Sequence, residues 1–142
     1  MTTARFFRRS PDVPLPAYQT AGACAFDLAV LETAVLAPGE RRLFRTGLVV
    51  CVPEGHVLVL ASRSSNAKKG ICLANGIGII DQDYCGPDDD LKLVLHNIGD
   101  APYTVAAGER VAQGMFLPVT RAQLVEATEL RTPSRGGFGT TG

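Results

Sequence analysis

Residues 73–96, LANGIGIIDQDYCGPDDDLKLVLH, contain two strand-like runs on either side of a polar turn. In the second run, residues 91–96, leucine occupies every second position, so the leucines share one face of a strand and are expected to point into a core. The first run contains two glycines, which suit a strand that approaches a flat ligand closely. It ends on Asp81, Asp83 and Tyr84. The stretch therefore predicts a rigid strand that presents polar groups at a turn.

Short apolar runs of this kind continue along the whole chain. They are separated about every 8–12 residues by Pro, Gly or Asp clusters, as in β-sandwiches and barrels. The expected strands cover residues 5–9, 24–31, 41–52, 56–62, 71–73, 77–80, 91–97, 103–105 and 110–119. One short helix is expected over residues 64–69, capped by Ser64 or Ser65 and ended by Gly70. The pattern predicts an all-β sandwich or barrel with at most one short helix.

Composition narrows the class of protein. A chain of 142 residues has the size of one domain, and 14 basic against 14 acidic residues do not indicate a polyanion-binding face. Four cysteines without a C-x-x-C pair and two histidines show no zinc-ligand spacing. No apolar run approaches a signal peptide or the roughly 20 residues of a membrane span. We expect a cytoplasmic protein, with a nuclear or virus-encoded one left open.

Polar residues inside or just beyond apolar strands are the candidate site residues. Asp27 lies within a strand, where a carboxylate requires a partner or a cation, and Gln113 is a milder case. Residues 63–65, Arg-Ser-Ser, leave a strand and taken alone indicate a surface turn. Asp81 and Asp83 taken alone are ordinary Asp-x-Asp turn chemistry.

Residues 131–142, RTPSRGGFGTTG, form a tail that cannot pack a core. Most glycine-rich termini are solubilising ends. Phe138 argues against that interpretation, because its ring can stack on a base while Arg135 and the backbone amides meet phosphates.

Taken in order, five segments resemble the five motifs of the trimeric dUTPase family. They are residues 25–28, 63–65, 75–86, 108–113 and 135–142. The resemblance implies a jelly-roll β fold, a homotrimer with three shared active sites, and Mg²⁺-dependent hydrolysis of dUTP to dUMP and pyrophosphate. It implies a β domain over residues 1–130 and a flexible arm over residues 131–142 that closes over the active site. No nucleic acid or membrane partner is implied.

The resemblance also assigns residue roles. Asp81 would activate the attacking water, as general bases do. The uracil edge would be read by Asn75 and the backbone of residues 76–80, and Tyr84 would lie under the deoxyribose and exclude a 2′-hydroxyl. Asp27 would act on Mg²⁺ through a water molecule, because this ion keeps several waters. The implied substrate-binding residues are Arg63, Ser64, Ser65, Asn75, Gly78, Ile80, Tyr84, Gln113, Arg135, Phe138, Gly139 and Thr140. Phe138 would stack on uracil, and Arg135, Thr140 and Thr141 would face the outer phosphates.

Three departures from the family pattern stand out. Ser62 replaces a proline, which is expected to loosen the turn before Arg63. Residues 87–90, Pro-Asp-Asp-Asp, lengthen the hairpin, and their charges would repel a triphosphate unless they face solvent or a partner. Arg135 lies closer to Phe138 than is common, so either Arg131 or Arg135 grips the terminal phosphate.

Two other functions compete with this interpretation. A dCTP deaminase-type enzyme shares the fold, but it needs a catalytic glutamate whose setting is not found here. A catalytically weak nucleotide-binding or regulatory protein would retain the fold, and retention of Asp81 with the phosphate-binding residues speaks against it.

Overall fold

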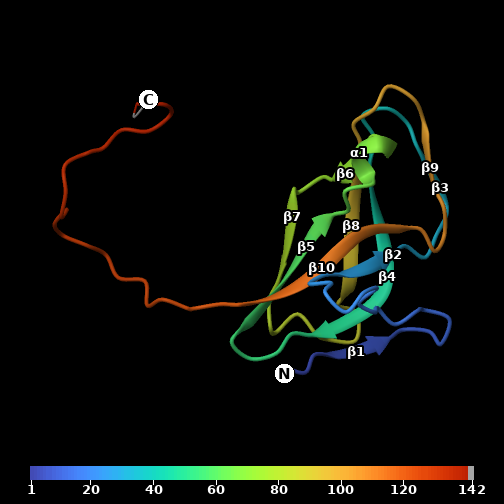
Figure 1. Ribbon diagram of the computed structural model, residues 1–142, viewed down its shortest axis with the longest axis horizontal. Coiled ribbons are helices and arrows are strands. Elements are labelled where there is room, and N and C mark those ends of the chain that lie inside the picture. Colours follow the sequence, from blue (N-terminus) through green and yellow to red (C-terminus); the bar gives the residue numbers. More distant parts are fainter. Residues whose placement is uncertain (141–142) are drawn as a thin grey trace.

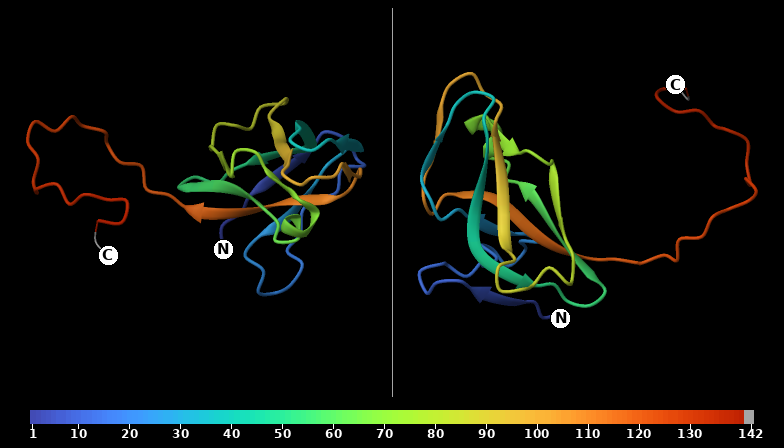
Figure 2. Two further views of the ribbon diagram at one scale, coloured as in Figure 1. Left: turned by 90° about the horizontal axis from the view of Figure 1, so that it is seen from above. Right: turned by 180° about the vertical axis from the view of Figure 1, so that it is seen from behind.

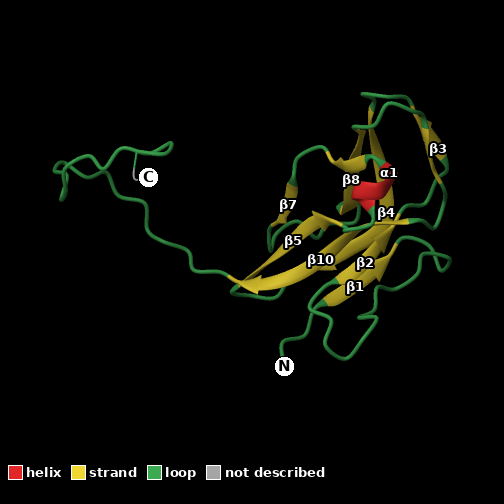
Figure 3. Cartoon of the chain, turned by 45° about the horizontal axis from the view of Figure 1, so that its top comes forward, coloured by secondary structure: helices red, strands yellow, loops and turns green. Residues whose placement is uncertain are grey.

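The computed structural model describes residues 1–140, and almost all regular structure in them is β-strand (Figure 3). The elements are β1 (Arg5–Arg8), β2 (Phe26–Ala29), β3 (Ala34–Leu36), β4 (Arg41–Cys51), β5 (His56–Ser62), α1 (Asn66–Lys69), β6 (Ile71–Leu73), β7 (Ile77–Ile80), β8 (Asp90–Asn97), β9 (Tyr103–Val105) and β10 (Arg110–Pro118). The prediction of an all-β fold with one short helix is confirmed. Only β3 was not anticipated, and β2 is shorter than the expected strand over residues 24–31.

The strands form two antiparallel four-stranded sheets and one small ribbon (Figure 1). The first sheet has the order β1-β4-β8-β6, the second has the order β2-β10-β5-β7, and β3 pairs with β9. Neighbouring strands are mostly distant in sequence, as in Greek-key and jelly-roll proteins. The predicted jelly-roll class is confirmed.

The core lies between the two sheets. Leu91, Leu93 and Leu95 of β8 are buried against Phe44 of β4 and the inward side chains of β5. Full burial of one such side chain stabilises the fold by roughly 1.5–3 kcal/mol. The alternation in residues 91–96 therefore predicted the inward face of β8 correctly.

A β-bulge in β4 is organised around the carboxylate of Asp90, the first residue of β8. The pairing of β4 with β8 shifts between Arg45 and Val49, and Gly47 within the bulge has a φ of +69°. Asp90 is 0% exposed and accepts hydrogen bonds from Arg45 Nε at 3.1 Å and from the Gly47 amide at 3.2 Å. Burial alone raises the pKa of Asp90, but the guanidinium and the amide outweigh it and hold this pKa below its ordinary value.

The 87–90 extension packs onto the body of the same chain. Asp88 forms an ion pair with Arg9 at 2.8 Å, and Arg9 also donates to the carbonyl of Pro87. Asp89 accepts the Gly86 amide at 2.8 Å and so closes its own turn. Each aspartate of the extension thus has a partner within the same chain.

The short helix differs from its prediction at its first turn. It covers Asn66–Lys69 and ends at Gly70 with a φ of +70°, as expected. Ser65 takes the N-cap position but has an α-helical backbone and makes no side-chain capping bond. The predicted side-chain capping bond was wrong: N-cap residues usually have an extended backbone, whereas the backbone of Ser65 is helical.

After β10 the chain leaves the body as an extended arm (Figures 1 and 2). Its last hydrogen bond to the body joins the Val119 amide to the carbonyl of Gly55 at 2.9 Å. Leu124, Leu130 and Phe138 are exposed on it. No helix among the described residues is long and apolar enough to cross a membrane.

We predict that Asp90→Ala lowers the free energy of unfolding by about 1–3 kcal/mol, because it leaves the buried Gly47 amide without an acceptor and Arg45 without its partner. Urea unfolding at pH 7 and fixed protein concentration measures the effect. Asp88→Ala is the matched control, because it removes only an exposed ion pair worth about 0–1 kcal/mol. Equal losses in the two variants would contradict this account of the bulge.

Candidate active site

Three charged residues meet where β2, β5 and β10 lie side by side. Arg63, directly after β5, contacts one carboxylate oxygen of Asp27 through Nε at 2.8 Å, and Arg110 contacts the other through Nη1 at 3.0 Å. Arg63 also donates to the carbonyl of Arg110 at 3.0 Å. This Asp27 cluster, formed by Asp27, Arg63 and Arg110, confirms that the carboxylate inside the strand needs cationic partners. Sequence reasoning missed Arg110, although it stands at the start of a strand that contains Gln113.

Gln113 extends the cluster across the sheet. It lies directly opposite Asp27 in the β2–β10 pair and opposite Ala61 in the β10–β5 pair. Its Nε2 donates to the carbonyl of Ser62 at 3.0 Å, and the Ser62 hydroxyl accepts the Leu73 amide at 3.0 Å. Ser62 is therefore tied to two strands, and its replacement of proline does not leave the turn without tertiary contacts.

The turn after Arg63 holds two buried polar atoms that have no hydrogen-bond partner among residues 1–140. They are Ser65 Oγ and Asn66 Oδ1. The other amide atom of Asn66, Nδ2, donates to the carbonyl of Val111 at 2.7 Å and ties the turn to β10. Unpartnered buried acceptors cost free energy, so this turn is suited to a ligand or water that completes its hydrogen bonds.

Glu109, which precedes Arg110, makes hydrogen bonds that connect α1 with the turn before β10. Its Oε1 accepts Lys69 Nζ at 2.6 Å and the Tyr103 hydroxyl at 2.5 Å, and its Oε2 accepts the Ala106 amide at 3.0 Å. Burial alone raises the pKa of Glu109, but these donors hold it below its ordinary value. Burial and the Glu109 hydrogen bond raise the pKa of Tyr103 to about 12.

A second group of predicted residues lies on β7. Asn75 closes the turn before β7 by donating to the carbonyl of Ile77 at 2.9 Å. Gly78 faces Leu60 of β5 so closely that an added Cβ would stand 3.0 Å from the Leu60 Cβ. A small cavity of about 130 Å³ lies here, lined by Leu60, Leu73, Asn75, Gly78, Ile79, Ile80, Lys92 and Leu93. The glycine keeps the backbone bare at this cavity.

Asp81 follows β7 and begins a turn whose backbone bond runs from the Tyr84 amide to the Asp81 carbonyl at 3.3 Å. Within the described part of the chain its carboxylate has no ion-pair partner. It borders a larger open hollow, which is also lined by His56, Val57, Ile79, Gln82, Asp83, Val119 and Arg121. A free carboxylate beside an open hollow is able to contact a ligand and a water together.

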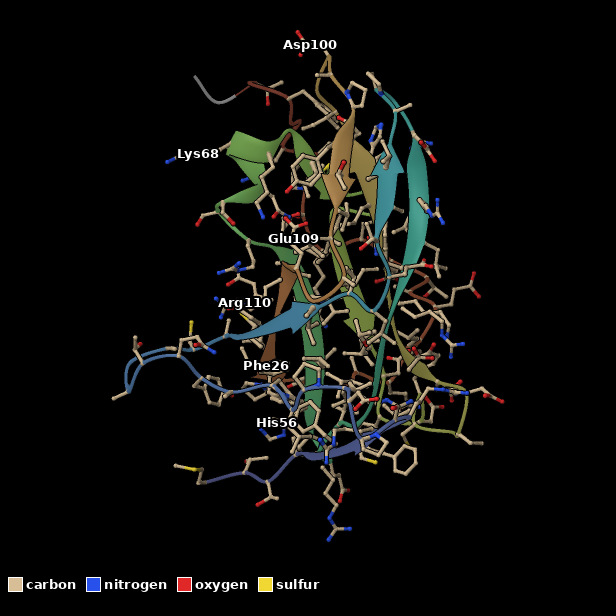
Figure 4. All side chains as sticks on the ribbon, turned by 90° about the vertical axis from the view of Figure 1, so that its right-hand side faces the viewer. Phe26, His56, Lys68, Asp100, Glu109 and Arg110 are labelled. Atoms are coloured by element: carbon tan, nitrogen blue, oxygen red, sulfur yellow. The ribbon has the colours of Figure 1, made fainter. Side chains whose placement is uncertain are left out.

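Within this single chain the two groups of residues lie far apart. Ile80 pairs with Leu58, so Asp81 lies beside the start of β5, whereas Arg63 follows its end. Six residues of β5 separate the position beside Asp81 from Arg63, which corresponds to roughly 20 Å along the strand. Figure 4 shows His56, at the start of β5, far from Lys68 of α1, with Arg110 and Glu109 between them. The phosphates of a nucleotide are joined by single bridging oxygens and do not span this gap.

The arm residues are also remote from both groups. Phe138 is fully exposed, and the Thr140 amide donates to the carbonyl of Gly137 at 3.2 Å. Figure 1 shows the segment after β10 extended away from the body of the protein. Thr141, also expected at the phosphates, lies outside the described residues.

The outer face of the second sheet is apolar. In register across the strands, Val59 of β5 lies between Met115 of β10 and Ile79 of β7, and Ala61 lies beside Ile77. Ile77 and Ile79 are 53% and 55% exposed. This apolar sheet face consists of Val57, Val59, Ala61, Ile77, Ile79, Met115 and Leu117. At one end this apolar sheet face adjoins Gln113 and Asp27. A partner that covered the face would therefore reach the Asp27 cluster.

A family model described as dUTPase matches residues 11–142. The chain belongs to the dUTPase family. It is 46% identical over 138 residues to the deoxyuridine 5′-triphosphate nucleotidohydrolase of Methylocella silvestris, a match that covers 92% of this chain and 84% of the relative.

Solved dUTPase structures match the family fold. The dUTPase of Streptococcus mutans is 35% identical with a TM-score of 0.77, over 83% of this chain and 98% of that one. The dUTPase of Staphylococcus bacteriophage 80alpha with dUPNHPP is 25% identical with a TM-score of 0.88, over 100% and 99% of the two chains. The resemblance drawn from the five motifs is thereby confirmed.

We predict that Glu109→Gln destabilises the fold by about 1–3 kcal/mol at neutral pH. Since the pKa of Glu109 is lowered on folding, its contribution is present above the unfolded-state pKa and is lost as the pH falls through the folded-state pKa. The difference in unfolding free energy between wild type and variant should therefore shrink below about pH 4. Urea unfolding from pH 3 to 7 measures this, with the exposed Glu32→Gln as control. A difference in unfolding free energy that does not change with pH would show that the ionised Glu109 carboxylate does not stabilise the fold.

Proposed function

We propose that this chain hydrolyses dUTP to dUMP and pyrophosphate at a site completed by other copies of itself. Family membership and relatives named deoxyuridine 5′-triphosphate nucleotidohydrolase support the reaction. The observation that carries it is the placement of Asp81: a free carboxylate stands directly after a strand whose bare glycine lines a small cavity.

The cavity at β7 takes the uracil. Gly78 and the backbone up to Ile80 supply amide and carbonyl groups that can pair with the base edge, and Asn75 stands at the rim. With the backbone this close to the base, a thymine methyl would find no room. Tyr84, three residues after Asp81, would lie under the deoxyribose.

Asp81 is the general base of the proposed reaction. Its carboxylate takes a proton from the water that attacks the α-phosphorus, and the pyrophosphate leaves with the electrons of the broken P–O bond. General-base assistance of this kind contributes about 10²–10⁴-fold to the rate.

The phosphates bind at the Asp27 cluster and the turn after it. Arg63 offers a guanidinium, and Ser64, Ser65 and Gln113 offer hydroxyl and amide donors. The unpartnered Ser65 Oγ supports this assignment, because a phosphate oxygen would accept its proton.

A divalent metal fits this site only when the triphosphate carries it. Among residues 1–140 no three His, Cys, Asp or Glu side chains are grouped to hold a metal ion. Both oxygens of Asp27 already meet arginines, which suits contact with a hydrated Mg²⁺ through a water molecule rather than direct ligation. When bound, the ion neutralises charge on the phosphates.

The separation of the two groups implies a site shared between copies. A second copy seated on the apolar sheet face can bring its own Asp81 toward the Asp27 cluster, and a cyclic homotrimer would repeat this three times. Burial of Ile77 and Ile79 would stabilise this assembly.

Residues 131–142 form the proposed closing arm on the β domain of residues 1–130. Exposed apolar side chains and the distance from the body support docking on another copy. Phe138 would stack on uracil, while Gly139 and Thr140 approach the phosphates. Arg135 is adjacent to this turn, and Arg131 is the alternative contact for the terminal phosphate. Closure would exclude bulk water from the reaction.

The reaction is tested by incubating the intact protein with dUTP and Mg²⁺ and measuring pyrophosphate and dUMP. We expect stoichiometric release, and we expect Asp81→Asn to bind the non-hydrolysable analogue dUPNHPP normally while turnover falls by about 10²–10⁴-fold. No pyrophosphate from the intact protein, or ammonia released from dCTP, would overturn the proposal.

The shared site is tested by mixing inactive variants. Asp81→Ala and Arg63→Ala chains, unfolded and refolded together, should regain activity in about a quarter of the sites, because each restored site takes one intact residue from each chain. A chain that ends at Leu130, refolded together with Asp81→Ala, tests in the same way whether the arm of one copy serves the site of another. Each variant refolded alone is the control. A mixture no more active than its components would show that each copy acts alone.

A further inference from the structure

Lys92 has an unusual set of contacts for a lysine at an outward position of β8. Its Nζ donates to the Tyr84 hydroxyl at 3.2 Å, to the carbonyl of Asp88 at 3.1 Å and to the carbonyl of Asp90 at 3.3 Å. An ammonium group has three donors, so these acceptors use all of them. The side chain is one-third exposed, and its charged end points back to the chain instead of into solvent.

The ammonium is anchored by the 87–90 extension. Two of its acceptors are carbonyls of that segment, and the buried carboxylate of Asp90 lies 3.7 Å away. Asp90 is in turn held by Arg45 and the bulge of β4. Lys92 therefore has a fixed position relative to the core, unlike a solvated lysine, whose side chain samples many rotamers.

Tyr84 depends on Lys92 for the position of its hydroxyl. The Tyr84 hydroxyl accepts from Lys92 and reaches the carbonyl of Asp90 only at 3.5 Å, which is long for an O–H donor. The ammonium also lies 5.8 Å from the centre of the Tyr84 ring, within the range of a cation–π contact. The backbone amide of Tyr84 is tied to Asp81, so Lys92 is the main restraint at the other end of this side chain.

Lys92 also borders the proposed base cavity, together with Asn75 and Gly78. Lys92 therefore lies near both the proposed base cavity and Tyr84. Displacement of the tyrosine ring by a few tenths of an ångström would change the space left beside the sugar.

We propose that Lys92 is a positioning residue for sugar selection, which holds the Tyr84 ring where it excludes a 2′-hydroxyl. The proposal rests on the proposed function, in which Tyr84 lies under the deoxyribose. Without the ammonium the ring gains freedom to tilt, and a ribonucleotide enters more easily. A purely structural role for Lys92 would instead lower stability and affect dUTP and UTP equally.

The test compares kcat/KM for dUTP and UTP in wild type, Lys92→Met, Tyr84→Phe and the double variant. Methionine keeps the apolar stem of lysine without its charge. We expect the ratio of the two kcat/KM values to fall by about tenfold in each single variant. The double variant should show no further fall, because both changes remove the same contact. Arg41→Met, which removes one exposed charge from β4 in the same sheet, should leave the ratio unchanged.

The outcomes separate this inference from the function on which it rests. An unchanged dUTP/UTP ratio in a Lys92→Met protein that still hydrolyses dUTP would overturn the positioning role. Additive losses in the double variant would show that Lys92 does not act through Tyr84, and would overturn it as well. If Lys92→Met does not fold, the fall in Tyr84→Phe, which keeps the ring, decides in its place. A wild type inactive on dUTP would instead overturn the proposed function.

Discussion

The buried carboxylate of Asp90 is the interaction on which the rest of the structure depends. It joins the bulge of β4 to the first residue of β8, and it must be ionised in a place without solvent. Arg45 and the Gly47 amide make that possible, since they hold the pKa of Asp90 below its ordinary value despite burial. The 87–90 extension ends on this carboxylate, and Lys92 is anchored beside it. The segment between Asp81 and β8 therefore ends on one satisfied ion in the core.

The direction of β5 is the second constraint. It carries Arg63 at one end and lies beside Asp81 at the other, so a single copy holds the phosphate-type donors and the free carboxylate too far apart for one nucleotide. The apolar sheet face between them offers a reason for copies to associate. In the proposed assembly, association and catalysis are linked, because a contact that covered Ile77 and Ile79 would also complete the site.

Sequence reasoning succeeded where a signal was local or repeated. Leucine alternation predicted the inward face of β8, and a carboxylate inside a strand correctly indicated cationic partners for Asp27. It failed for the Ser65 cap, because the helical backbone of Ser65 is set by a turn that Asn66 ties to Val111 of a distant strand, and no local pattern shows that contact. Contacts between residues distant in the chain, such as Arg9 with Asp88, left no pattern to read.

The sequence by itself determined the strand pattern, the family and the identity of the candidate chemical groups, because periodicity and ordered motifs are written along the chain. The tertiary structure alone decided which of those groups meet. It paired Asp27 with two arginines, kept Asp81 free at the opposite end of β5, and tied Tyr84 to Lys92. The physical reason is that strand register and the bulge of β4 set distances between residues remote in sequence, and electrostatic contacts act only over those distances.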